Sequence, residues 1–198
     1  MHNFITTVLQ GQYIRLEPLH SSHKEPLRIA AQNPLMCEFI GTSLLGDTFN
    51  DWFDKAMRDF SLASVPFVVR RLFDNQLIGS TRYYDIALEH ARLSIGYTWY
   101  VPEVWGSFVN PETKLLLLQY AFETLYVNRV QLKTDMRNAR SRAAIKKLGA
   151  TEEGILRQHM ILEDGFVRDT VIFSIIKPEW PYIKAGLQKR LLQFSEKT

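Results

Sequence analysis

The sequence predicts an α/β fold built on a mixed sheet whose N-terminal part is antiparallel. Three observations lead to this prediction. Period-two alternation indicates strands, most clearly at residues 92–101, where Leu93, Ile95 and Trp99 alternate with smaller or polar residues. Segments with apolar residues at helical spacing lie between the strands. The predicted order is strand, two helices, three strands, helix, strand, helix, two strands and helix.

The N-terminal half holds the first strand, two helices and a run of three strands. Residues 13–19 form the strand. Ser22 and Glu25 form a capping box for the first helix, and Thr48 caps the second, which carries a broad apolar stripe. Three strands then follow, at residues 67–71, 76–84 and 92–101. A turn at residues 74–75 joins the first two.

The C-terminal half begins with a loop at residues 102–109. Asn110 and Pro111 then open a helix, with the asparagine as N-cap and the proline at the first helical position. A strand at 130–134 leads to a helix that Asn138 caps and Gly149 ends. Asp164-Gly165 indicates a hairpin between strands 154–162 and 166–176, and an amphipathic helix follows it.

Composition favours one globular domain. The 198 residues are 46% apolar, which suffices for a sizeable core. We expect a single domain over residues 1–198, with residues 179–198 as a C-terminal helical extension. The lone cysteine, Cys37, excludes an internal disulfide and is expected to be a small buried apolar residue. No apolar run of about 18 residues and no signal peptide is present, so we expect a cytoplasmic protein.

Charge and histidine spacing argue against several classes of partner. The net charge of +3 is mild, although a basic cluster lies between Arg137 and Lys147. The cluster keeps open an RNA- or ribosome-associated binding protein, but no aromatic RNA-binding motif accompanies it, so we expect no specific nucleic acid. The five histidines lack metal-ligand spacing, so we expect no metal. We expect no membrane partner, and a homodimer stays open.

The strand–loop–helix unit at residues 97–122 is the main candidate for ligand binding. A loop that leads into a helix presents free backbone N–H groups and the positive end of the helix dipole. Such an end binds phosphate without any side chain, and pyrophosphate is a natural guest. The alternative is an ordinary strand-to-helix crossover.

A family resemblance bears on this choice. The stretches IGYTWYVPEVWGSFVNPETKLLLLQYAFE and NRVQLKTDMRNARSRAAIKKLGATEEGILR resemble the GCN5-related N-acetyltransferase (GNAT) superfamily, most of all its ribosomal-protein-alanine N-acetyltransferase type. The resemblance covers residues 13–179. It implies a mixed, mostly antiparallel sheet with a splayed central strand pair and helices on both faces, and acetyl-coenzyme A (acetyl-CoA) as co-substrate.

The resemblance also implies a cofactor site. The pantetheine arm would pair with the backbone of the splayed strand, at Trp99, Tyr100 and Val101. The pyrophosphate would lie on the following loop, at Gly106, Ser107, Phe108, Val109 and Asn110. The family pattern Gln/Arg-x-x-Gly-x-Gly/Ala is here Trp-Gly-Ser-Phe-Val-Asn, so phosphate binding requires the Phe108 side chain to point away from the ligand.

Further cofactor contacts are expected from two helices. Lys114, Arg142 and Lys146 are candidates for the adenosine 3′-phosphate or its neighbours, and each is alternatively an exposed basic residue. Asn138 matches the family asparagine that touches the pantetheine arm, which is compatible with its role as N-cap.

Catalysis in the superfamily is direct transfer within a ternary complex. The backbone N–H of Tyr100 or Val101 would polarise the thioester carbonyl. Ser141 is a candidate proton donor to the thiolate, or else a first-turn serine bonded to the backbone. Relatives often have Glu where this chain has Ser94, so the base is open between Asp85, Glu89 and water, and we select Asp85.

The sequence thus predicts an N-acetyltransferase that moves an acetyl group from acetyl-CoA to a primary amine, either a protein N-terminus or a small amine. A ribosomal protein is one candidate acceptor. Two alternatives stay open: transfer of another acyl group such as succinyl, and a CoA-binding module without turnover.

Overall fold

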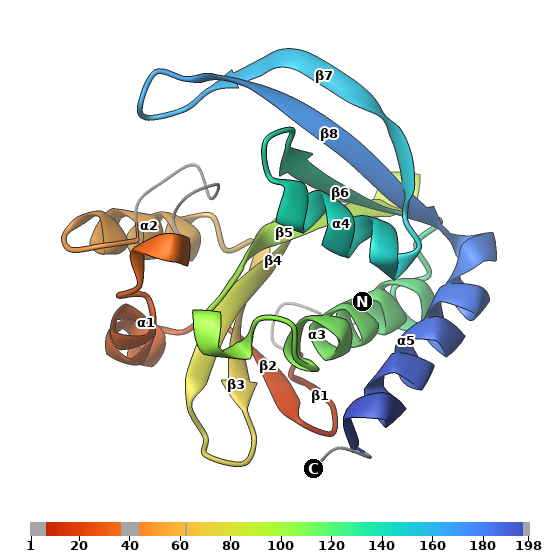
Figure 1. The fold of residues 1–198 in the computed structure, drawn as a ribbon, viewed down its shortest axis with the longest axis horizontal. Helices are drawn as coiled ribbons and strands as arrows, with labels where there is room; N and C mark the ends of the chain where they lie inside the picture. Colours follow the sequence, from red (N-terminus) through yellow and green to blue (C-terminus); the bar gives the residue numbers. More distant parts are fainter. Residues whose placement is uncertain (1–6, 37–43, 62, 196–198) are drawn as a thin grey trace.

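The computed structural model describes residues 7–36, 44–61 and 63–195, so Cys37 lies outside the described residues. Eight strands form one sheet in the order β1-β2-β3-β4-β5-β6-β8-β7 (Figure 1). Neighbouring strands are antiparallel except β5 and β6, which run parallel. The mixed, mostly antiparallel sheet is therefore confirmed.

The strands and helices follow the predicted order, with one short strand added at the N-terminus. The strands are β1 (Leu9–Gln10), β2 (Ile14–Pro18), β3 (Val65–Arg71), β4 (Leu77–Ala87), β5 (Arg92–Tyr100), β6 (Arg129–Asp135), β7 (Thr151–Ile161) and β8 (Val167–Ile176). The helices are α1 (Lys24–Ala30), α2 (Thr48–Arg58), α3 (Val109–Gln119), α4 (Ala139–Leu148) and α5 (Trp180–Ser195). A single π-helical turn, Tyr120–Thr124, extends α3.

Helices cover both faces of the sheet (Figure 1). The main core joins the sheet to α3, α4 and α5, and a second core joins the opposite face to α1 and α2. On β3, Phe67 and Val69 enter the main core and Val68 the second, as period-two alternation requires. The C-terminal helix contributes Trp180, Ile183 and Leu187 to the main core. Over the described residues, no helix has the length and apolar character needed to cross a bilayer.

Three predicted helix caps are wrong. The turn before α1 is capped by His20, whose side chain accepts a hydrogen bond from the Ser22 N–H, and not by Ser22. Helix α2 follows Asp47, and Thr48 already belongs to the helix and donates to a preceding carbonyl. Helix α3 follows Phe108, so Asn110 lies inside the first turn, where its side chain accepts from the Tyr100 hydroxyl at 3.2 Å.

The C-terminal elements confirm the local signals in the sequence. Asn138 caps α4 by accepting from the Ser141 N–H at 2.8 Å, and Gly149 ends the helix with φ 99°. Strands β7 and β8 form the predicted hairpin, which reaches beyond the rest of the sheet (Figure 1). Strand β7 is the last strand in the order, and all its residues are exposed. Its pairing with β8 shifts register twice, and Gln158 adopts φ 49°.

A buried carboxylate fastens α3 to the N-terminal hairpin. Glu112 is 3% exposed, and its oxygens accept the backbone N–H groups of Gln12 at 2.6 Å, Tyr13 at 3.0 Å and Ile14 at 3.0 Å. In the same turn, a Cβ atom at Gly11 would overlap the Glu112 carboxylate, so a larger residue there would displace this side chain. The contact fixes the start of α3 against the edge of the sheet.

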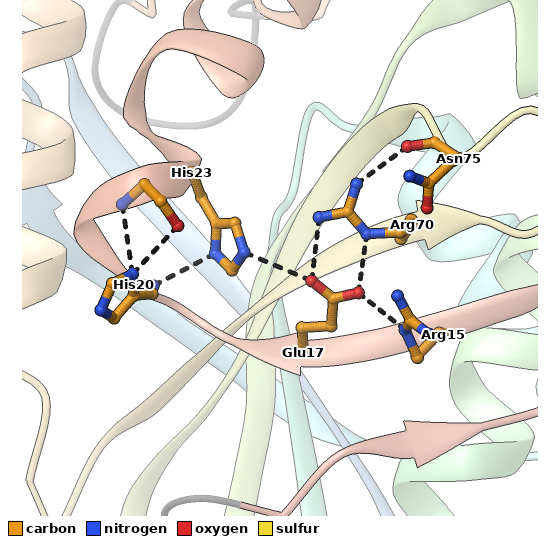
Figure 2. A network of polar contacts seen from close by, with 7 residues as sticks. Arg15, Glu17, His20, His23, Arg70 and Asn75 are labelled. Atoms are coloured by element: carbon orange, nitrogen blue, oxygen red, sulfur yellow. Dashed lines mark hydrogen bonds and ion pairs between the residues drawn. The ribbon is translucent and has the colours of Figure 1, made fainter.

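A second polar network surrounds Glu17 on β2 (Figure 2). Its carboxylate accepts from the Arg15 and Arg70 guanidinium groups, both at 2.7 Å, and lies 3.3 Å from the Nε2 atom of His23. Although burial opposes the charge, the hydrogen bonds and charges of Arg70 and Arg15 lower the pKa of Glu17 to about 2. Burial lowers the pKa of His23, whose Nδ1 atom accepts from the His20 N–H. The fold therefore favours the neutral form of the His23 imidazole.

Glu17→Gln should lower the free energy of unfolding at pH 7. It should also make this free energy depend less on pH between 4.5 and 2. A folded-state pKa below the ordinary 4.5 means that the carboxylate stabilises the fold above pH 4.5 and loses this effect as the pH falls towards 2. Urea unfolding at pH 7, 4.5 and 2.5 measures it, with the exposed Glu25→Gln as control. A difference between wild type and Glu17→Gln that does not shrink with acid would contradict the assignment.

Candidate active site

Strands β5 and β6 part halfway along their length. Their parallel pairing runs from Arg92–Arg129 to Ile95–Leu132 and then ends. Beyond this point β5 continues on β4 as far as Tyr100, while β6 continues on β8 as far as Asp135. The splayed central strand pair expected from the family resemblance is therefore confirmed.

A bulge in β5 lies at the point of separation. Ser80 pairs with Trp99 and Arg82 with Gly96, so Tyr97 and Thr98 together oppose a single residue of β4. Tyr97 has φ 50°, a left-handed conformation that is costly for a tyrosine. Before the bulge Ile95 enters the main core, and after it Trp99 enters the second core. The bulge therefore changes which side chains of β5 face each side of the sheet.

One backbone group of β5 is directed into the resulting gap. Val101 donates its N–H to the Ile78 carbonyl at 2.9 Å, so it belongs to the ladder with β4. Successive N–H groups of a strand point to opposite sides, so the Tyr100 N–H points away from β4, towards the gap. The Trp105 indole caps the Tyr100 carbonyl at 2.9 Å. The predicted role of the Val101 N–H is thus wrong, and Tyr100 remains the candidate donor.

A cleft of about 740 Å³ occupies the gap. Strands β4, β5, β6, β7 and β8 contribute to its lining, together with α2, the loop before α3 and one face of α4. Eight of the predicted site residues line it: Asp85, Trp99, Tyr100, Gly106, Asn110, Lys114, Asn138 and Ser141.

Two helix N-termini meet at one side of the cleft, which we call the helix side. The loop before α3 contributes Gly106, with φ 75° and open space around it, and α4 contributes the capping residue Asn138. Between them the Arg140 guanidinium stacks 3.7 Å from the Trp105 ring. Helix dipoles and this cation make the helix side favourable for an anion such as a phosphate. Arg140 is a site residue that the sequence prediction missed, although it lies inside the recognised basic cluster.

Six predicted cofactor residues do not line the cleft, and four of them lie between residues 101 and 109. Val101 is in the ladder, and Val109 is fully buried in the main core. The Ser107 hydroxyl donates to the Val104 carbonyl at 2.6 Å within the loop. The Phe108 ring packs 4.5 Å from the Tyr13 ring and 6.3 Å from that of Phe194. Phe108 therefore points away from the cleft, which leaves the loop backbone open to a ligand.

The structure does not bring Arg142 and Lys146 into the cleft. The Arg142 side chain donates to the Met136 carbonyl at 3.2 Å, and Lys146 forms an ion pair with Glu152 at 2.8 Å. Helical geometry explains the difference, since Arg140 and these two residues occupy different faces of α4. Among the basic residues of α4, Arg140 is therefore the one that lines the cleft.

Lys114, expected either to contact a cofactor phosphate or to be an exposed basic residue, is buried in the structure. Only 7% of the residue is exposed, and its ammonium donates to the Thr98 hydroxyl at 3.2 Å, which in turn contacts the Thr81 hydroxyl at 2.8 Å. Among the described residues no carboxylate pairs with it. Burial lowers the pKa of Lys114 to about 8. A desolvated cation that lines the cleft is thus available to an anionic or carbonyl group of a ligand.

The opposite side of the cleft, which we call the strand side, carries aromatic and charged residues of β4, β5, β6 and β8. The Tyr84 and Tyr97 rings meet edge to face at 5.1 Å. Asp85 is paired with Lys133 at 3.0 Å, and its carboxylate lies 3.5 Å from the Ser94 hydroxyl. A carboxylate therefore lies beside the serine that stands where relatives often have Glu. Ser141 lines the same cleft from the first turn of α4.

Comparison with known families decides the identity of this fold. The acetyltransferase (GNAT) domain model matches residues 14–151. The chain belongs to the GNAT acetyltransferase family. The match includes the parted strands β5 and β6 and the start of both helices on the helix side of the cleft.

Two curated GNAT relatives come from Bacillus subtilis (strain 168). YoaA, an uncharacterized N-acetyltransferase, is 32% identical over 110 residues, which are 56% of this chain and 61% of YoaA. YdaF, provisionally named a ribosomal N-acetyltransferase, is 32% identical over 109 residues, which are 55% of this chain and 58% of YdaF. The matched region thus spans about three fifths of each relative.

Solved GNAT structures share the fold over nearly the whole chain. A GCN5-related N-acetyltransferase from Brucella melitensis has a TM-score of 0.88 and 28% identity, covering 94% of this chain and 86% of that one. RimJ of Mycobacterium smegmatis, solved in complex with CoA-disulfide, has a TM-score of 0.77 and 15% identity, covering 93% and 95%. At 15% identity the likeness to RimJ concerns the fold alone.

Lys114→Met should stabilise the free GNAT protein at pH 7. Because the folded-state pKa of about 8 lies below the ordinary 10.5, the buried charge destabilises the fold at pH 7, by up to about 3 kcal/mol, and the cost disappears as the pH rises to 10.5. Urea unfolding at pH 7 and pH 10 tests this, with the exposed Lys147→Met as control. A variant that is less stable than wild type at pH 7 would show that Lys114 contributes net stabilising contacts.

Proposed function

We propose that this chain is an acetyl-CoA-dependent N-acetyltransferase that acetylates a primary amine by direct attack in a ternary complex. The observation that carries the proposal is the cleft between the parted strands β5 and β6, with its helix side suited to phosphates and its strand side open to a second substrate. Two substrates that approach from opposite sides would meet in the gap. Membership of the GNAT family supports this reading.

The helix side offers the groups that acetyl-CoA needs. The Tyr100 N–H is directed into the gap, where it would hydrogen-bond an oxygen of the pantetheine arm or of the thioester. The first turns of α3 and α4 would receive the phosphates, with Arg140 beside them and Asn138 at the pantetheine arm. The buried Lys114 would add a positive charge next to β5. The lining therefore fits an anionic, extended ligand.

Transfer requires three events that the cleft residues can support. The amine nitrogen attacks the thioester carbon, the C–S bond breaks, and the CoA thiolate leaves. Asp85 would take the proton released by the amine, directly or through water, because its carboxylate lies beside Ser94 on the separating strand. Ser141 would donate a hydrogen bond to the departing thiolate, and the Tyr100 N–H would stabilise charge on the carbonyl oxygen.

A CoA-binding module without turnover is the second candidate, because Phe108 and Asn110 depart from the family's loop pattern. Phe108 packs outside the cleft and Asn110 accepts from the Tyr100 hydroxyl, so both departures leave the loop backbone available. Ser94 is compensated by the neighbouring Asp85. These contacts favour the enzyme over the module. Binding of RNA is disfavoured, since Arg137 and Lys146 of the basic cluster are paired with Asp135 and Glu152.

Acetyl-CoA should bind in calorimetry and should release free thiol when a suitable amine is added. A panel of peptides with free N-termini, including ribosomal-protein N-termini suggested by the name of YdaF, and of small amines would identify the acceptor class. Asp85→Asn should lower turnover about 10²- to 10⁴-fold and keep acetyl-CoA affinity. Binding without thiol release over the whole panel would favour the non-catalytic module, and no binding at millimolar acetyl-CoA would reject both.

Ser141→Ala should lower turnover within the range of about 10²- to 10⁴-fold that general-acid help contributes, while cofactor affinity stays nearly unchanged. Asn138 caps α4 by itself, so the loss of the hydroxyl should cost the fold little. Turnover, acetyl-CoA affinity and melting temperature of the variant distinguish the two roles. Full turnover together with a lowered melting temperature would assign Ser141 to the helix start and proton delivery to water.

A further inference from the structure

The strand side of the cleft carries two arginines with few partners. Arg82 on β4 is 6% exposed, and its one hydrogen bond among the described residues joins Nη1 to Asp59 at 3.5 Å. This distance is longer than the roughly 2.7–3.2 Å of an ordinary N–H···O hydrogen bond. Its Nε atom is buried without a partner. A guanidinium has five N–H donors, so most of those of Arg82 are unused.

Arg168 on β8 is in a similar position. Its Nε atom lies 3.8 Å from Asp135, beyond hydrogen-bond distance, and is buried without a hydrogen bond. Asp135 is already occupied, because its carboxylate accepts the Arg137 side chain at 2.8 and 3.1 Å and the Arg137 N–H at 2.8 Å. The Asp135 carboxylate thus interacts with two arginines, and its interaction with Arg168 is the weaker one.

Both arginines line the same cleft from opposite sides of the gap between β5 and β6, because β4 pairs with β5 and β8 pairs with β6. The Arg82 guanidinium stacks 4.6 Å from the Tyr97 ring. Burial lowers the pKa of both arginines, which means that their partners repay the lost hydration only in part. All three side chains line the cleft, and Tyr97 forms the bulge where β5 leaves β6.

We propose that Arg82 and Arg168 form a carboxylate-binding subsite, so that the amine acceptor of this protein carries an acidic group close to its amine. The proposal rests on the proposed N-acetyltransferase function and narrows its substrate class. A planar guanidinium binds a carboxylate through paired, charge-assisted hydrogen bonds, which neither an uncharged amide nor a hydroxyl reproduces. The carboxylate has two sources: the α-carboxylate of a free amino acid, or an acidic side chain near the N-terminus of a peptide.

Two matched pairs of acceptors separate these sources. The first pair is alanine and alaninamide. The second is a C-terminally amidated tetrapeptide with Ala-Glu or Ala-Gln at its N-terminus. Each is titrated calorimetrically into the protein saturated with CoA and assayed for acetyl transfer from acetyl-CoA. We expect the acidic member of one pair to be preferred about tenfold or more in affinity and in kcat/KM, as for hydrogen bonds to a charged group.

Variants assign the preference to the two arginines. Arg168→Gln should abolish the difference between acid and amide and leave the amide member unchanged. Because Arg82 is more deeply buried, Arg82→Lys is the second variant, and it should weaken the preference while it keeps the charge. Arg92→Gln, at an exposed position outside the cleft, is the matched control. Melting temperature and acetyl-CoA affinity confirm that each variant is folded.

The outcomes are separable from those of the proposed function. Equal binding of acid and amide in both pairs, no binding of any member, or a preference that survives both variants would overturn the subsite. Preferential binding of the acid without acetyl transfer would uphold the subsite and reject the enzymatic function for these acceptors. Acetyl transfer with equal preference for acid and amide would uphold the enzymatic function and reject the subsite.

Discussion

The structure depends on the separation of β5 from β6 after Ile95, where β5 stays hydrogen-bonded to β4 but no longer pairs with β6. Backbone N–H and C=O groups inside a protein need partners, so separating two central strands has a cost that something else in the fold or a ligand must offset. Here the Trp105 indole satisfies the Tyr100 carbonyl, while the Tyr100 N–H faces the gap. The protein itself thus provides a hydrogen-bond partner for the Tyr100 carbonyl, whereas the Tyr100 N–H is left for a bound group.

The walls of this opening are held from outside it. Helix α3 is fixed at its start by Glu112, which binds three N–H groups of the β1–β2 turn, and in its middle by the Tyr83 hydroxyl, which donates to the Leu117 carbonyl. Helix α4 is defined by Asn138 at one end and Gly149 at the other. Each wall is anchored to a different part of the chain, and two contacts join the walls, the Lys133–Asp85 ion pair and the Arg140–Trp105 stack. Buried polar atoms without partners, such as Nε of Arg82 and of Arg168, can therefore persist inside the gap.

Local sequence signals correctly predicted those features of the fold that depend only on neighbouring residues. The Asn138 cap, the Gly149 helix end, the β7–β8 hairpin and the alternation of β5 follow from residues within a few positions of one another. Predictions failed where distant contacts decide the outcome. Asn110 lies inside the first turn of α3 and contacts Tyr100 instead of capping the helix. The basic residue of α4 that lines the cleft is Arg140, and not Arg142 or Lys146. The resemblance located the cleft correctly, but the arginines of the strand side come from β4 and β8, which only the folded sheet brings together.

The outermost strand, β7, has a consequence for how the protein coexists with other chains. A long, regular strand at the rim of a sheet invites a foreign strand to add to it and so promotes aggregation. In β7 the two register shifts and the left-handed Gln158 interrupt the ladder, so its outer side offers no continuous row of donors and acceptors of even spacing. The irregularity therefore lowers the tendency of this exposed hairpin to pair with a strand of another chain.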